Sequence, residues 1–158
     1  MFRELTDFKG LWTLTRYIAQ RNAPDAELRG SATMRPDADG LIYHEVGLLT
    51  VGDSPPVQAE RRYLWRDGGN GAIEVLFEDG RAFHRIDPAN LNDTHWCDPD
   101  TYDVTYDFKT WPNWSSTWRV RGPRKDYDMV TRYSFAGATK PHKGPHRPIA
   151  PYHTGRMH

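Results

Sequence analysis

The side chains best suited to bind a small molecule stand at alternate positions in segments that read as β-strands. Arg16 and Arg61 each present a planar guanidinium, which binds a carboxylate or phosphate through two parallel hydrogen bonds. Glu45 can neutralise one of these cations. Tyr43 and Tyr63 each stand two positions from a charged residue, and the two-residue period of a strand places them on the same face. We therefore predict a buried face on which one cation is left to meet an anionic ligand.

More polar and aromatic residues share these faces if the motif positions point inward. The candidate ligand-binding residues are Arg16, Tyr43, Glu45, Arg61, Tyr63, Trp65, His84, His95, Cys97, Tyr102 and Trp118. A barrel filled only for stability would carry Leu, Val and Ile here, whereas ligand pockets combine an aromatic lining with a few convergent polar groups. A closed internal network, in which the charged residues satisfy one another, is the alternative. This set of residues depends on the strand register, because a shift of one residue would turn all the inward-facing side chains of a strand towards solvent.

Two histidines and the single cysteine raise the question of metal binding or catalysis. His95 and Cys97 point to the same side of a strand, and His84 could supply a third zinc ligand. No carboxylate stands at a spacing that would orient His84, so buried, hydrogen-bonded side chains are the favoured interpretation, and we expect no metal and no cofactor. An enzyme that uses His84, His95 or Glu45 for acid–base chemistry is an alternative function. No catalytic residue is assigned.

The elements that must position these residues are short and separated by turn-forming residues. Period-2 alternation predicts strands near residues 12–18, 28–34, 41–51, 57–66, 72–77, 82–86, 118–121 and 127–135. Residues 94–97 and 102–108 read as one further strand with a break at Pro99. Asp79 and Gly80 are a strong hairpin signal. The pattern predicts an all-β fold, a single up-and-down antiparallel barrel of about eight to ten strands.

The N-terminus adds a short helical turn. Phe2, Leu5 and Phe8 recur at a spacing of three, and Gly10 and Trp12 then begin the first strand. This start resembles that of the lipocalins and related calycin barrels. The resemblance implies that Trp12 lies at the closed end of the barrel, beneath the turn, and packs against an arginine of the last strand, here Arg132.

A more specific resemblance rests on five motifs in a fixed order. They are Tyr43, Glu45 and Gly47; Arg62, Tyr63 and Trp65; Asp79, Gly80, Arg81, Phe83 and His84; His95, Cys97, Asp100 and Tyr102; and Trp118, Val120, Gly122, Pro123, Lys125, Asp126 and Tyr127. Together they resemble the family catalogued as domain of unknown function 6314, over about residues 8–135. The resemblance implies a lipocalin-like barrel and brings no established activity with it.

The charged residues and prolines are distributed unevenly along the chain, and this distribution bears on both the domain boundary and the kind of partner. The 158 residues carry 21 basic and 21 acidic side chains, but the segment 137–158 has four basic residues, four prolines, four histidines and no acid. Residues 1–136 therefore carry a formal charge of −4. We predict a barrel domain over 1–136 and a Pro/His-rich basic tail over 137–158. An acidic body argues against a nucleic-acid partner.

Location and partners follow from the same composition. No apolar run is long enough to span a membrane, and the N-terminus lacks the apolar core of a secretory signal. A single cysteine fits a reducing compartment. We expect a cytoplasmic barrel that binds a small anionic or aromatic ligand, without a membrane partner. A non-catalytic module that contacts a protein partner is the third functional alternative.

Overall fold

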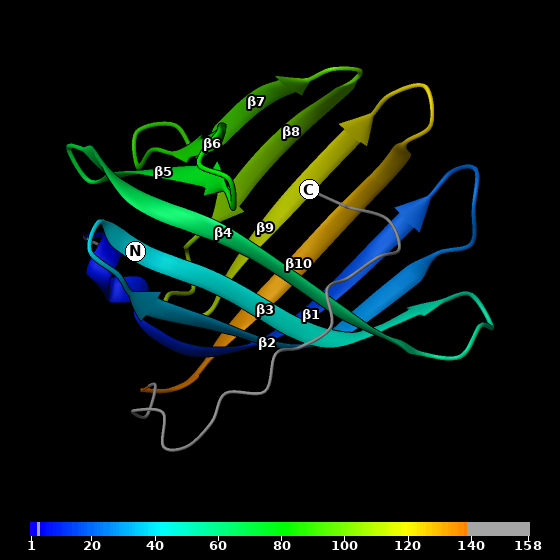
Figure 1. Ribbon diagram of the computed structural model, residues 1–158, viewed down its shortest axis with the longest axis horizontal. Helices are drawn as coiled ribbons and strands as arrows, with labels where there is room; N and C mark the ends of the chain where they lie inside the picture. The colour runs from blue at the N-terminus through cyan, green and yellow to red at the C-terminus, as the bar shows by residue number, and fades with distance from the viewer. Residues whose placement is uncertain (3, 139–158) are drawn as a thin grey trace.

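The chain folds into ten strands preceded by one 3₁₀ turn, in a computed structural model that describes residues 1–2 and 4–138 (Figure 1). The elements are η1 (Leu5–Phe8), β1 (Gly10–Gln20), β2 (Ala26–Pro36), β3 (Gly40–Val51), β4 (Val57–Gly69), β5 (Ala72–Phe77), β6 (Ala82–Ile86), β7 (Asn92–Cys97), β8 (Asp100–Asp107), β9 (Trp114–Arg121) and β10 (Asp126–Gly137).

All ten strands form one antiparallel sheet in the order β6-β5-β4-β3-β2-β1-β10-β9-β8-β7. The first and last strands pair in its middle, so β6 and β7 are its two edges. They meet at the turn between them, where Asp87 and Asn90 form an isolated bridge and the backbone N–H of Arg85 donates to Asp93 Oδ2 at 2.7 Å. The sheet thus curls into a nearly closed barrel (Figure 1), which confirms the predicted fold class and the N-terminal turn.

Aromatic side chains close the barrel at the end where η1 lies. The rings gathered there are those of Phe2, Phe8, Trp12, Phe108, Trp111 and Trp114. The side chain of Trp12 is 1% exposed, and its indole N–H donates to the backbone oxygen of Phe8 at 2.8 Å. This bond satisfies the one polar group that Trp12 buries. The structure therefore places Trp12 at the closed end beneath the N-terminal turn, as predicted.

The predicted contact between Trp12 and Arg132 is wrong. Arg132 pairs with Thr15, is exposed, and lies on the outer face of β10. The inward positions of β10 are Tyr127, Met129, Thr131 and Tyr133, all of which are buried. Strict alternation from Tyr127 excludes Arg132 from the interior.

The strand expected across Pro99 is also wrong. Residues 92–97 and 100–107 form two strands, β7 and β8, which pair with each other through His95 and Tyr102. Asp98 and Pro99 make the turn that joins them. A proline has no N–H to donate to a ladder, so it sits where the chain reverses rather than inside a strand.

The last described strand extends one residue past the predicted domain boundary. Strand β10 ends at Gly137, which pairs with Leu11, so one residue of the predicted tail belongs to the barrel. The rest of the tail, from residue 139, lies outside the described residues. No helix in the described part of the chain is long and apolar enough to cross a membrane.

Candidate ligand-binding site at the open end of the barrel

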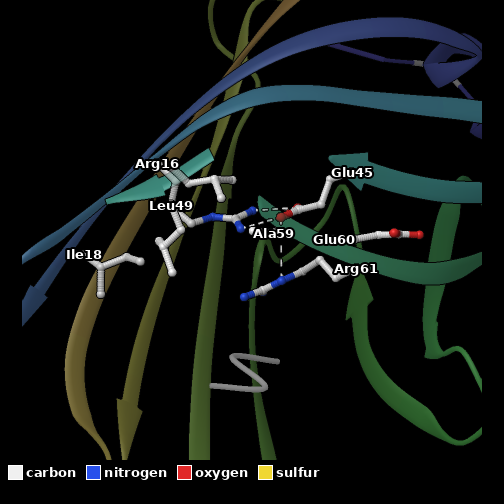
Figure 2. Close-up of a pocket in the computed structure, with 8 residues that line it drawn as sticks. Arg16, Ile18, Glu45, Leu49, Ala59, Glu60 and Arg61 are labelled. Atoms are coloured by element: carbon white, nitrogen blue, oxygen red, sulfur yellow. Dashed lines mark hydrogen bonds and ion pairs between the residues drawn. The ribbon is translucent and has the colours of Figure 1, made fainter. Parts of the chain in front are cut away.

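A small pocket lies between β1, β2, β3 and β4, towards the end of the barrel opposite η1, which we call the open end. Its lining residues are Arg16, Ile18, Leu28, Glu45, Leu49, Ala59, Glu60 and Arg61 (Figure 2). We call this the Arg61 pocket. Its volume of about 10 Å³ is room for about one water molecule. The pocket can therefore enclose one head-group atom of a ligand in place of a water molecule, but no large molecule.

Arg16 is held by neighbours from two other strands, β3 and β10. Its Nη1 and Nη2 donate to the two oxygens of Glu45 at 2.6 and 2.8 Å, and its Nε donates to Thr131 Oγ1 at 2.7 Å. Both side chains of the pair are 4% exposed. Tyr43 donates to Glu45 Oε1 at 2.6 Å and shares a hydrogen bond of 2.8 Å with the hydroxyl of Tyr133. This network is the closed arrangement expected of a buried ion pair.

Arg61 lies partly buried beside this network and is more weakly paired than Arg16. Its Nε lies 3.6 Å from Glu45 Oε2, and its Nη1 donates to the hydroxyl of Tyr63 at a long 3.4 Å. Among the described residues, Nη2 of Arg61 has no hydrogen-bond partner. The Arg61 side chain is 12% exposed, and its guanidinium lies 5.9 Å from the ring centre of Trp118. Arg61 is thus a cation with free donors at the edge of the pocket.

The charge of this group is set by the pKa of Glu45. Burial works against ionisation, but the guanidiniums of Arg16 and Arg61 outweigh it and lower the pKa of the carboxyl from 4.5 to about 2. Burial raises the pKa of the Tyr43 and Tyr63 hydroxyls, which therefore remain donors. At neutral pH the group carries two positive charges and one negative charge.

Glu60 does not change this balance. Figure 2 shows the carboxylate of Glu45 between the two guanidiniums, whereas that of Glu60 points away from them. On the outer face, Glu60 Oε1 lies 2.8 Å from Nη2 of Arg62 and 2.8 Å from Nε2 of His44. Arg62 therefore balances Glu60 outside the barrel wall.

The other predicted site residues lie elsewhere in the interior. Trp65 packs in the closed half, stacked on Tyr43 at 6.0 Å. A second cluster surrounds the buried ring of Phe83 and contains His84, His95, Tyr102 and Trp118. Cys97 is half-buried at the end of β7. The structure thus brings together five predicted residues at the pocket, Arg16, Tyr43, Glu45, Arg61 and Tyr63, and groups four others around Phe83.

His84 is buried in the barrel interior and forms a hydrogen bond with Tyr106. Its Nε2 lies 2.8 Å from the hydroxyl of Tyr106, and its ring is 5% exposed. Burial, helped by His95, lowers the pKa of His84 from 6.5 to about 3. The carboxylate of Glu45 is bound by Arg16 and lies beside Arg61. The geometry therefore does not favour the acid–base alternative. Within the described residues no group of three or more His, Cys, Asp or Glu is arranged to hold a metal ion.

Sequence reasoning missed three residues of this site, all on β10. Thr131 and Tyr133 complete the network around Arg16 and Glu45, and Tyr127 buries a hydroxyl that has no partner in the described part of the chain. The signal was present in the sequence, since these residues alternate along one strand. Choosing Arg132 as the inward residue reversed the face of that strand.

Comparison with known proteins adds one finding at this point. The chain matches the model of a family of unknown function, DUF6314, over residues 8–135. The chain belongs to this family. The matched range runs from the end of η1 almost to the end of β10, so the DUF6314 match covers the barrel and its Arg61 pocket. No curated protein and no solved structure matches the chain.

Proposed function

We propose that this DUF6314 barrel binds a small anion at its open end, with Arg61 as the residue that receives it. The observation that carries the proposal is the state of Arg61, a largely buried cation that shares Glu45 with Arg16 and keeps a guanidinium nitrogen without a partner in the described chain beside a pocket. A largely buried charge with too few partners is costly, and a bound anion lowers that cost. Arginine also suits anions because its donors lie in one plane.

The size of the pocket limits what is enclosed. A volume of about 10 Å³ accepts a head-group atom in place of a water molecule, while the remainder of the ligand extends towards the open end. The aromatic interior leaves little room for a ligand that fills the lumen. The partner is therefore a small molecule held by its charged end. A nucleic acid is not favoured, because residues 1–136 carry a formal charge of −4.

The test compares two arginines of β4, Arg61 at the pocket and Arg66, which pairs with Asp37 at 2.9 Å and does not line the pocket. Native mass spectrometry of freshly purified protein detects a co-purified small acid, and calorimetric titration with acetate, nitrate and sulfate measures binding. Arg61→Met removes the cation but keeps a long apolar side chain, and Arg66→Met is the matched control.

We expect Arg61→Met to weaken binding of the best anion at least about 10-fold, which corresponds to the loss of about 1.4 kcal/mol. Arg66→Met should leave it unchanged. Wild-type protein that binds none of the three anions, or equal binding by wild type and Arg61→Met, would overturn the proposal.

A further inference from the structure

The charged residues around the Arg61 pocket determine which anion it accepts. Arg16 and Arg61 contribute two positive charges and Glu45 one negative charge, so the group has one positive charge in excess. Glu60 is turned away and balanced by Arg62, and Lys125 and Asp100 pair with each other at 3.3 Å. A monoanion would bring the group to neutrality. A dianion would leave a buried negative charge without a partner.

From this balance we infer that Glu45 makes the pocket selective for a singly charged, planar anion, namely the carboxylate of an aliphatic acid. This inference rests on the proposed function and names its ligand class. By occupying Arg16, Glu45 removes the second cation that a phosphate or sulfate dianion would need.

The geometry of the free donors supports a carboxylate. Three N–H groups of Arg16 are already used by Glu45 and Thr131, so Arg16 offers no open face. Only Arg61 offers the edge of a guanidinium, with Nη2 free and Nη1 weakly bound to Tyr63. One guanidinium edge matches the two coplanar oxygens of a carboxylate. A tetrahedral dianion would leave oxygens facing the wall.

That wall is apolar. Ile18, Leu28 and Leu49 line the pocket next to the arginines and are 1%, 3% and 5% exposed, with Ala59 beside them. None of these side chains can donate a hydrogen bond to a second charged oxygen. They can pack against the carbon atoms next to a carboxylate. The wall therefore favours an aliphatic substituent.

The test measures charge preference and then changes the charge of the pocket. Butyrate, nitrate and sulfate are titrated calorimetrically at equal ionic strength into the wild-type chain and into three variants. Glu45→Gln raises the net charge of the group to two, the double variant Arg16→Met/Glu45→Gln returns it to one, and Arg61→Met is the binding-deficient reference. Thermal melting of each variant shows that it is folded.

We expect the wild type to bind butyrate at least about 10-fold more tightly than sulfate, with nitrate between them. Glu45→Gln should reduce or reverse that ratio, and the double variant should restore it because its charge equals that of the wild type. If Glu45→Gln does not fold, the double variant still tests the charge balance: its net charge equals that of the wild type, so it should keep the preference for butyrate, and a preference for sulfate in it would contradict the inference.

Two results overturn the inference and leave the proposed function standing: sulfate binding at least as tightly as butyrate in the wild type, or a ratio that Glu45→Gln leaves unchanged, in each case with binding lost in Arg61→Met. Anion binding that survives in Arg61→Met instead overturns the proposed function itself.

Discussion

At the residue scale, Glu45 and His84 decide how the interior responds to acid. Glu45 is held ionised by two arginines, and His84 is held neutral by burial. For Glu45 the pKa is about 2 in the folded chain and its ordinary value is 4.5, so its contribution to stability is complete above about pH 4.5. That contribution is lost as the pH falls towards 2.

His84 acts at higher pH. Its pKa is about 3 in the folded chain and about 6.5 when unfolded, so below pH 6.5 the unfolded chain binds a proton that the folded chain does not. Stability therefore falls with pH from about 6.5 towards 3, by up to about 1.4 kcal/mol per pH unit. The range from pH 6.5 to 4.5 isolates His84 from Glu45.

This gives a prediction for His84→Phe, which replaces the titrating ring by an aromatic ring that does not titrate. Urea denaturation at pH 7, 6 and 5 should show a clearly shallower loss of unfolding free energy in the variant than in the wild type. Tyr106→Phe removes the hydrogen bond of His84 but keeps its titrating ring, so it should retain the wild-type slope. Equal slopes for wild type and His84→Phe would show that His84 is not buried in the neutral form.

At the element scale, the closed end depends on the contact between η1 and β1. Phe8 and Trp12 are 0% and 1% exposed, and the hydrogen bond from Trp12 to the backbone of Phe8 fixes the turn over the barrel. Trp111 and Trp114 pack on the same rings. The Trp-rich segment after β8 is therefore a plug at the closed end and not a lid at the open one.

We predict that Trp12→Ala lowers the free energy of unfolding by about 3–5 kcal/mol, the usual cost of deleting a buried large aromatic side chain. Trp96→Ala is the control, because Trp96 is 62% exposed on β7 and its removal should change stability by about 0.5 kcal/mol or less. Chemical denaturation measures both. Similar small losses in the two variants would mean that the closed end is not packed as described.

The alternation of inward and outward side chains along the strands explains which site residues could be predicted from the sequence. Alternation along β1, β3 and β4 correctly turned Arg16, Glu45 and Arg61 inward, because each lies in a strand with buried neighbours two residues away. In β10 the same rule holds for Thr131 and Tyr133, and only the choice of Arg132 was mistaken. The way in which Arg16 rather than Arg61 binds both oxygens of Glu45 depends on contacts between distant segments, which no local pattern encodes. The β7–β8 hairpin is local, but alternation alone did not show that the chain reverses at Pro99.

At the scale of the whole molecule, the ten described strands run from Gly10 to Gly137. Strands β1 and β10 pair from Leu11 and Gly137 to Gln20 and Tyr127 in the middle of the sheet. We keep as a prediction that the basic tail contributes little to the fold, since its prolines and charges form no periodic apolar face. The cut that tests this belongs after Ala138, because Gly137 pairs in the sheet.

A chain truncated after Ala138 should keep the circular dichroism spectrum of the full chain and a cooperative thermal transition within a few degrees of it. A molten or unfolded product would mean that residues 139–158 are part of the domain, and the division of the chain into barrel and tail would be wrong.

The most direct measurement of the central claim is nuclear magnetic resonance of the arginine side chains during titration with butyrate. Arg16 and Arg61 are buried, so their Nε–H groups should give resolved signals, which Arg16→Met and Arg61→Met assign. We predict that the Arg61 signal shifts in a saturable manner while that of Arg16, bound to Thr131, stays in place. A titration in which the Arg61 signal does not move, or moves only in proportion to ionic strength, would contradict an anion site at Arg61.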